Sequence, residues 1–503
     1  MPHYPLGAQI PASAHAVSSS LPDMNAVIGY EENDPQVLNE LKSGYPRFVV
    51  HVYIEKLREI FKKELGFEGH ELALLNSDQS ISRLCRHLGG GDISHGFHHE
   101  VPYVAYPGRR KYRKRAKEFL QHTGIGISSR EAEQVLANLG HLKPEAAQRE
   151  SRNYAYPDQL VTNAIAKHSG IHEERITLTN SGMNAFYAGF KAAESIQGEV
   201  GKSIWIQLGW LYLDTTHVIN KLGKSRTEVV TICDASDLVA VKSAFHEHSG
   251  KIAGVITEAP TNPLVQTAEL NAIRRLCDAE GAILLVDPTL ASIANVDVTD
   301  YADIIVTSLT KYAANEGDIM MGAVMPGVLQ PWTERWLADL RHYVETPFTG
   351  DLARMAVEIG SWTHYAQLIN ANCRKLARFL EAHRAVRRVF WAEAVTNHRR
   401  FSKVRKKGGG PGSIITIYLR RPDRMAEFYE RLALAKGPSF GTRFTLCCPF
   451  MYLAHYDLVS TESGRNQLWE SGIDPDLLRI SVGSEPIDSI IEAFSEALDP
   501  LSA

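Results

Sequence analysis

Lys311 is the strongest candidate for a catalytic residue, because of its amine and of the residues that precede it in the sequence. It follows an apolar run and the small hydroxyl residues Ser308 and Thr310, in the stretch ADIIVTSLTK. Another apolar run, AILLV, ends directly before Asp287. A lysine amine that meets an aldehyde, and a carboxylate that keeps a pyridine nitrogen protonated, are the two groups that pyridoxal phosphate (PLP) catalysis requires. The pair therefore predicts a PLP site in which Lys311 carries the cofactor and Asp287 holds its ring nitrogen.

A phosphate group needs hydrogen-bond donors, and the segment after ITLTN can supply them. There Ser181, Gly182 and Met183 lie between an apolar run and a helical pattern. The first N–H groups of a helix have no partner within the helix, and the helix dipole favours an anion at that end. We expect the backbone of Gly182 and Met183, with the hydroxyls of Ser308 and Thr310, to bind the phosphate.

The elements that position these residues alternate between short Val- and Ile-rich runs and amphipathic stretches from about residue 176. This order predicts an α/β domain with a mostly parallel sheet covered on both faces. Ligands of such sheets bind beyond the carboxyl ends of the strands, where Asp287 and Lys311 would lie. Beyond residue 349 longer helices and fewer strands predict a smaller α+β domain. We expect an N-terminal module over residues 1–149, a PLP-binding domain over 150–348 and a C-terminal domain over 349–503.

Composition excludes several classes of partner. A net charge of -4 gives no bias towards nucleic acid or anionic membrane, and the basic run at residues 109–117 is typical of a solvated helix face. No apolar run reaches the about 18 residues of a membrane span, and the first residues, MPHYPLGAQIP, do not form a secretory signal. The six cysteines show no metal-ligand spacing, so we predict reduced thiols, no metal site and a cytoplasmic enzyme.

The motifs in this order resemble the Cys/Met-metabolism family of PLP enzymes. The similarity covers about residues 150 to 500, and its strongest part contains PTNP, VDPT and SLTKY, with NSGMNAFYA upstream and RISVGSEP at the end. The resemblance implies the type I fold of PLP-dependent transferases, as in aspartate aminotransferase, and a homodimer or homotetramer. The first 149 residues are similar to the long N-terminal region of fungal-type cystathionine γ-synthases.

The resemblance also assigns roles to single residues. Lys311 matches the Schiff-base lysine, Asp287 its pyridinium partner, and Ser308 and Thr310 the phosphate hydroxyls. Arg479, in RISVG, matches the arginine that binds the α-carboxylate of the substrate, a task that suits the fork of a guanidinium. Two further matches imply substrate contacts, those of Asn262 and Ser439.

Two positions depart from the family pattern. Trp210 stands where the family has a tyrosine that stacks on the cofactor, so either Trp210 stacks and Tyr212 supplies the hydroxyl, or the phenol function is absent. The family's Y-x-R segment, which reaches the phosphate of the neighbouring subunit, matches Arg152 without its tyrosine. Tyr45 and Arg47 have the same spacing but lie far upstream, so Arg152 is the residue we predict to bind the cofactor.

The activity that the resemblance implies is γ-replacement on an O-activated homoserine. In this reaction Lys311 would act as anchor and as base, and a thiol would replace the γ-substituent. Addition of cysteine would give cystathionine, as in transsulfuration and methionine biosynthesis. Related enzymes act as O-acylhomoserine sulfhydrylases, as other γ-substituting enzymes, or as cystathionine or methionine lyases, and these alternatives stay open. The intact lysine, aspartate and arginine argue against a scaffold without catalysis.

Overall fold

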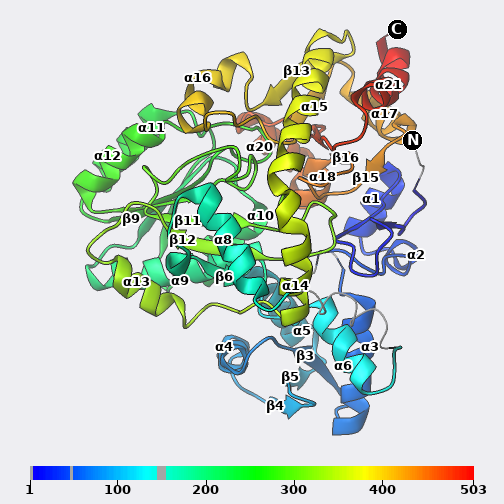
Figure 1. The fold of residues 1–503 in the computed structure, drawn as a ribbon, viewed down its shortest axis with the longest axis vertical. Coiled ribbons are helices and arrows are strands. Elements are labelled where there is room, and N and C mark those ends of the chain that lie inside the picture. Colours follow the sequence, from blue (N-terminus) through cyan, green and yellow to red (C-terminus); the bar gives the residue numbers. More distant parts are fainter. Residues whose placement is uncertain (1–3, 46–48, 144–153, 503) are drawn as a thin grey trace.

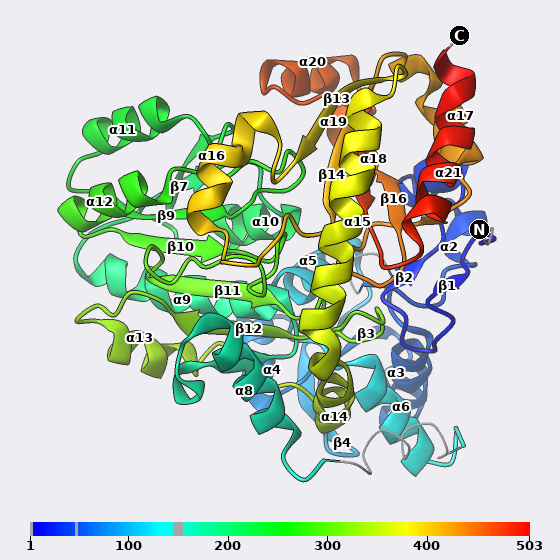
Figure 2. The same cartoon turned by 45° about the horizontal axis from the view of Figure 1, so that its top comes forward.

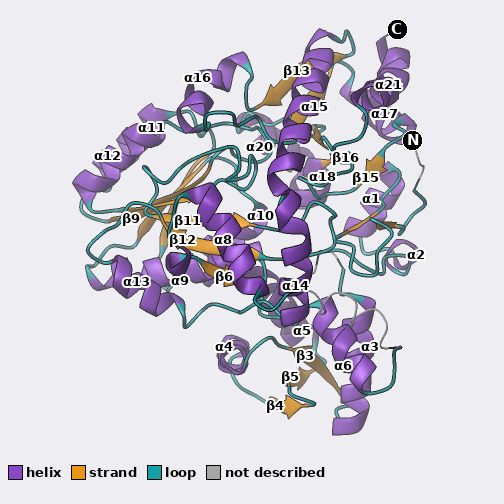
Figure 3. Ribbon diagram, viewed as in Figure 1, coloured by secondary structure: helices purple, strands orange, loops and turns teal. Residues whose placement is uncertain are grey.

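The computed structural model describes residues 4–45, 49–143 and 154–502. Within them the middle of the chain forms a seven-stranded sheet, the C-terminal part a five-stranded sheet, and residues 70–107 a three-stranded sheet (Figures 1 and 3). A two-stranded ribbon lies near the N-terminus. No helix of the described residues is both long enough and apolar enough to cross a membrane.

The central sheet has the strand order β6-β12-β11-β10-β9-β7-β8. Its strands are β6 (Thr177–Thr179), β7 (Ile204–Leu208), β8 (Glu228–Ile232), β9 (Ile252–Glu258), β10 (Ile283–Asp287), β11 (Ile304–Ser308) and β12 (Gly322–Pro326). Strand β12 runs in the direction opposite to the other six strands, which all run the same way. The prediction of a mostly parallel sheet in an α/β protein is therefore confirmed.

Both faces of this sheet are buried, as the apolar runs predict. Along β10, Ile283 and Leu285 belong to one hydrophobic cluster, while Leu284 and Val286 belong to the cluster on the opposite face. Successive side chains of a strand point to opposite faces, so a strand covered on both sides is apolar throughout. The covering helices are α8 (Pro157–Ser169), α9 (Gly182–Glu199), α10 (Leu213–Leu222), α11 (Leu238–Glu247), α12 (Leu270–Glu280) and α13 (Thr333–Leu340).

The C-terminal part contains the sheet β13-β14-β17-β16-β15 and the long helix α15, which runs beside the central domain (Figure 2). Its strands are β13 (Val386–Trp391), β14 (Ile414–Leu419), β15 (Ala435–Lys436), β16 (Leu446–Pro449) and β17 (Leu478–Ser481). Its helices are α14 (Thr349–Glu358), α15 (Trp362–Ala382), α16 (Val395–Val404), α17 (Met425–Arg431), α18 (Phe450–Ala454), α19 (Tyr456–Val459), α20 (Glu462–Glu470) and α21 (Ile487–Leu498). This is the smaller α+β domain that the sequence predicts.

Residues 49–143 form a sandwich around the sheet β3-β5-β4. Its strands are β3 (His70–Leu74), β4 (Ser94–His98) and β5 (Val101–Pro107), and its helices are α3 (Val52–Leu65), α4 (Asp78–Leu88), α5 (Arg110–Thr123) and α6 (Ser129–Asn138). One hydrophobic cluster joins α3 and α6 to the sheet, and another joins α4 and α5 to its other face. The basic run at residues 109–117 thus lies almost wholly in a helix, α5.

Residues 4–45 pack elsewhere, against the C-terminal sheet (Figure 1). They form the ribbon strands β1 (Gln9–Ile10) and β2 (Ser18–Ser19) and the helices α1 (Met24–Glu31) and α2 (Pro35–Leu38). Val27 and Leu21 join the core of the C-terminal domain, and the backbone N–H of Leu21 donates to Lys436 O. The domain boundaries at residues 149 and 348 stay a prediction.

Candidate active site

A cavity of about 470 Å³ contains most of the predicted site residues. It lies beyond the carboxyl ends of the parallel strands, the edge at which β9, β10 and β11 end on Glu258, Asp287 and Ser308. The predicted residues on its wall are Gly182, Met183, Tyr212, Asn262, Asp287, Ser308, Thr310, Lys311 and Arg479. The N-terminal sandwich and the segment before it supply further wall residues, including Tyr45, His51, Leu72 and Tyr106.

The amine of Lys311 projects into this cavity and is held by two hydroxyl groups. Its Nζ donates hydrogen bonds to Tyr45 Oη and to Ser439 Oγ, the latter over 3.3 Å. Burial, with a smaller contribution from the positive charge of Arg479, holds the pKa of Lys311 well below its ordinary value. The amine is therefore neutral under conditions where an exposed lysine is charged, and a neutral amine can act as a nucleophile and as a base.

Asp287 is suited to bind a cation. Its Oδ1 accepts a hydrogen bond of 2.8 Å from the backbone N–H of Thr289, which fixes the carboxyl at the cavity wall. Burial raises its pKa to about 6, against 3.8 in water. A protonated ring nitrogen placed beside it would stabilise the ionised carboxylate, so this residue fits the pyridine nitrogen of PLP.

The N-terminus of α9 has the geometry that a phosphate cradle requires. Ser181 caps the helix, and its Oγ accepts from the N–H of Asn184 over 3.2 Å. A Cβ added at Gly182 would lie 2.6 Å from Ser308 Cβ, so only glycine allows this close approach of helix and strand. The hydroxyl of Thr310, in contrast, exchanges hydrogen bonds with the backbone of Met321. The helix N-terminus and Ser308 thus form the part of the cradle that fits the PLP phosphate.

Arg479 is a buried cation that faces the same cavity. Only 3% of its surface is exposed, and its Nη1 donates to Asn262 Oδ1 over 3.2 Å. The guanidinium carbon lies 4.7 Å from the ring centre of Phe450 and 5.4 Å from that of Phe440. Among the described residues no carboxylate lies within ion-pair distance of it, so the site can accept a carboxylate from a ligand.

Glu258 is a site residue for which no role is predicted from the sequence. It ends β9, and its two carboxyl oxygens accept from the backbone N–H groups of Tyr212 (2.6 Å) and Asn262 (2.9 Å). Burial, and then the charge of Asp287, raise its pKa well above the ordinary value. Glu258 therefore joins the two loops that carry Tyr212 and Asn262. Only its position at the end of a predicted strand could have indicated this.

The structure brings only some of the remaining predicted residues to the cavity. Trp210 packs against the C-terminal hydrophobic cluster, with its ring centre 5.2 Å from that of His455, and is not among the cavity-lining residues. Tyr212, two positions later, does line the cavity. Ser439 contacts the Lys311 amine. Arg152 and Arg47 lie outside the described residues, so their proposed phosphate contacts stay predictions.

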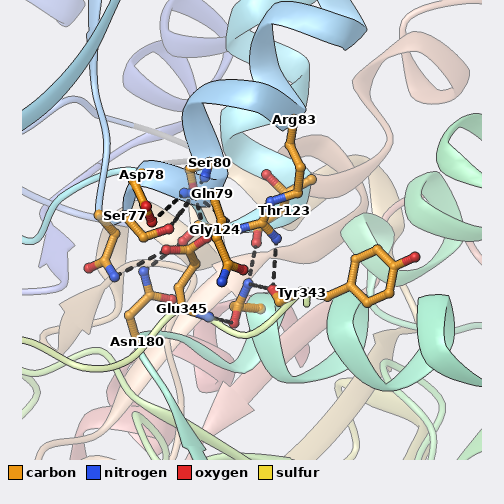
Figure 4. Close-up of polar contacts among 12 residues, drawn as sticks. Ser77, Asp78, Gln79, Ser80, Arg83, Thr123, Gly124, Asn180, Tyr343 and Glu345 are labelled. Carbon is orange, nitrogen blue, oxygen red and sulfur yellow. Dashed lines mark hydrogen bonds and ion pairs between the residues drawn. The ribbon is translucent and has the colours of Figure 1, made fainter. Parts of the chain in front are cut away.

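The N-terminal sandwich is bonded directly to the cradle (Figure 4). Asn180, which precedes Ser181, donates to Gly124 O over 2.7 Å, and Asn184 donates to Thr123 O over 2.9 Å. Nearby, the fully buried Glu345 carboxylate accepts from Ser80 Oγ and from the guanidinium of Arg83 on α4. These bonds fix residues 49–143 against the segment that carries the predicted phosphate donors.

Comparison with known proteins identifies the family. The family model of Cys/Met metabolism PLP-dependent enzymes matches residues 145–499. The chain belongs to this family. It is therefore a PLP-dependent enzyme, and the roles of Lys311, Asp287 and the N-terminus of α9 towards the cofactor stay predictions.

The relatives extend the similarity over the N-terminal region. The L-2-amino-4-chloropent-4-enoate dechlorinase/desaturase of Streptantibioticus cattleyicolor is 36% identical and covers 97% of both chains. The cystathionine γ-synthase of Neurospora crassa is 26% identical over 99% of this chain and 98% of its own. Among solved structures, cystathionine γ-synthase from Xanthomonas oryzae pv. oryzae in complex with cystathionine has a TM-score of 0.58 and 20% identity, covering 70% of this chain and 87% of that chain. This last likeness confirms the type I fold.

Proposed function

We propose that this enzyme removes a substituent from Cγ of an L-α-amino acid. Lys311, Asp287 and Arg479 all face one cavity, and this arrangement is the main support for the proposal. A base, a partner for the ring nitrogen and a binding site for the α-carboxylate are thereby available to one bound amino acid.

Each residue has a separate task in this proposal. PLP, when bound, withdraws electrons from the substrate carbons and makes the hydrogens on Cα and Cβ acidic. Lys311 removes those protons, because its amine is neutral. Asp287 keeps the ring nitrogen protonated, and the N–H groups of Gly182 and Met183 bind the phosphate with Ser308. Arg479 binds the substrate carboxylate, and Asn262 orients the guanidinium.

Elimination of chloride is the candidate we place first. In it the Cγ–Cl bond of a 2-amino-4-chloropent-4-enoate breaks, chloride leaves with the electron pair, and a substrate proton passes through Lys311 to water. The product gains one degree of unsaturation. Support comes from the dechlorinase/desaturase, with 36% identity over nearly the whole of both chains.

Gamma-replacement is the second candidate. The Cγ–O bond of an O-activated homoserine would break, and the acyl or phosphoryl group would leave with that oxygen as a carboxylate or a phosphate. The thiol of cysteine would lose its proton and bond to Cγ to give cystathionine, as in transsulfuration and methionine biosynthesis. The full-length similarity to the cystathionine γ-synthase of Neurospora crassa supports it. Sulfide as the nucleophile would instead give a sulfhydrylase. Loss of a thiol from Cγ with no incoming nucleophile, followed by hydrolysis of the unsaturated product to a 2-oxo acid and ammonia, would give a lyase.

The test presents the holoenzyme with both substrate classes. Chloride release from 2-amino-4-chloropent-4-enoate without added thiol would support elimination. Formation of cystathionine from O-acetyl- or O-succinyl-homoserine with cysteine would support replacement. Lys311→Ala serves as the inactive control. If neither class loses its γ-substituent, the proposed function is wrong.

We also propose that the enzyme is a homodimer or homotetramer of the cytoplasm. All six cysteines lie in the described part of the chain as free thiols, which suits a reducing compartment. Light scattering of the purified protein measures the oligomeric state, and a monomeric mass at micromolar concentration would contradict the assembly.

A further inference from the structure

Tyr45 reaches the Lys311 amine from a segment 266 residues away in sequence. Its hydroxyl contacts Nζ directly, and the same Nζ lies 4.1 Å from the centre of the Tyr45 ring. The hydroxyl is also 2.8 Å from Ser439 Oγ. Lysine, phenol and serine thus form a closed group of three polar atoms on the cavity wall.

The segment that carries Tyr45 is fixed to its own chain. Ser43, two positions earlier, is fully buried. Its carbonyl accepts from Ser19 Oγ over 2.6 Å, and its Oγ accepts from Gln9 Nε2 over 3.1 Å. Since residues 4–45 pack on the C-terminal domain, the phenol is held in place before any ligand binds.

The surroundings of Lys311 make a bound proton costly. Burial and the positive charge of Arg479 both disfavour the ammonium form. A phenol oxygen that accepts an ammonium N–H opposes this, and the face of an aromatic ring attracts the same charge. Burial raises the pKa of Tyr45. The phenol therefore keeps its proton and does not protonate the Lys311 amine.

We propose that Tyr45 is a catalytic residue that stabilises Lys311 while the amine holds the proton taken from the substrate, and that it acts in the active site of its own chain. When Lys311 acts as base, a C–H bond of the substrate breaks and an N–H bond forms on Nζ. One N–H of the resulting ammonium is donated to Tyr45 Oη, whose own proton stays on the phenol and is directed to Ser439. Tyr45 therefore strengthens the base without changing the net proton count.

Hydrogen exchange at Cα tests this role apart from the proposed function. L-Norvaline has no leaving group at Cγ, so its Cα exchange in D2O, followed by mass spectrometry, reports only proton removal by the PLP-loaded enzyme. We expect Tyr45→Phe to lower the exchange rate by about 10- to 100-fold, the value of a hydrogen bond to a charged group. Because Lys311 loses a stabiliser of its ammonium form, the rising limb of the pH profile should move to lower pH.

Two further variants separate catalysis from packing. Ser439→Ala should change rate and pH profile in the same direction by a smaller factor. Tyr456→Phe is the matched control, because its hydroxyl also holds the N-terminal segment, donating to Glu32 over 2.6 Å, but Tyr456 is not among the residues that line the cavity. It should exchange at the wild-type rate. Wild-type exchange with an unmoved pH profile in Tyr45→Phe would overturn the proposal.

Mixed assemblies test whether Tyr45 acts within its own chain. Tyr45→Phe and Lys311→Ala chains are co-expressed with different tags, and doubly tagged species are purified. If Tyr45 serves its own chain, no site contains both residues, and exchange stays at the level of Tyr45→Phe. Recovery towards the wild-type rate per intact lysine would show that the neighbouring chain supplies the phenol, and would overturn this half of the proposal.

Discussion

Asp287 and Glu258 are paired side by side at the carboxyl ends of the parallel strands β10 and β9. Both carboxyls are withdrawn from water, and their pKa values are raised, that of Asp287 to about 6 by burial and that of Glu258 well above its ordinary value by burial and the Asp287 charge. Both carboxyls line the cavity, but Glu258 accepts from two backbone N–H groups, whereas Asp287 accepts from one. The pair thus contains one structural carboxyl and one that a cationic ring nitrogen can stabilise.

In the absence of PLP, the buried Asp287 carboxylate should lower the free energy of unfolding, by an amount that depends on pH. Its pKa is raised from 3.8 to about 6, so the cost of the buried charge is absent below pH 3.8, grows between these values and is complete above pH 6. A shift of this size corresponds to about 3 kcal/mol. We expect apo Asp287→Asn to unfold at a higher temperature than apo wild type at pH 8, with a smaller difference at pH 5. Thermal unfolding at both pH values measures this, and equal differences would contradict it.

Glu258→Gln should disturb the loops of Tyr212 and Asn262. Both carboxyl oxygens accept from a backbone N–H, and the amide replaces one acceptor with a donor. A buried N–H left unpaired costs about 1–3 kcal/mol. We expect lower stability and a raised KM, because Asn262 also contacts Arg479. Denaturant unfolding and steady-state kinetics check the two effects, and a variant unchanged in both would exclude the positioning role.

Gly182→Ala should weaken PLP binding. The new Cβ would lie 2.6 Å from Ser308 Cβ, which forces α9 away from the strand that completes the cradle. The matched control is Gly198→Ala near the other end of α9, where the new Cβ would have only Lys224 Nζ near it, at 3.7 Å. Titration of the apoenzymes with PLP should show a higher Kd for the first variant alone. Equal affinities would argue against a cradle at this helix end.

Glu345→Gln should loosen the N-terminal sandwich. Its carboxylate is fully buried and accepts from Ser80 and Arg83, and removing one partner of a buried ion pair costs about 3–5 kcal/mol. Glu199→Gln, which breaks an exposed pair with Arg335, should leave stability nearly unchanged. Hydrogen exchange by mass spectrometry should show faster exchange in α4 and α5 for the first variant. The same pattern in both variants would contradict the anchoring role.

Local sequence was sufficient to predict the site residues that directly follow a strand. Asp287, Ser308 and Gly182 each lie within a few residues of a recognisable apolar run, and in a parallel sheet the strand ends meet at one edge. For that reason the sequence placed them correctly on one cavity wall. Strand β12 was not predicted, because GAVMP contains only one β-branched residue and its antiparallel pairing depends on β11 and β6.

Contacts between distant segments could not be predicted in the same way. Tyr45 meets Lys311 only because residues 4–45 pack on the C-terminal domain, and no periodicity in SGYPRF indicates that partner. Trp210 was aligned with a cofactor-stacking residue, but its neighbour His455 comes from the C-terminal domain, so its packing was not visible in the local pattern. Glu258 was visible at a strand end, yet its two bonds depend on how the following loops fold back.

Reduction with borohydride shows whether Lys311 is the residue that carries PLP. Reduction fixes the cofactor to the amine that holds it, and peptide mass spectrometry then locates the modified lysine. We expect the phosphopyridoxyl group on the peptide that contains Lys311, and none on that peptide in Lys311→Ala. An unmodified Lys311, or a modification on another lysine of the wild-type protein, would contradict it.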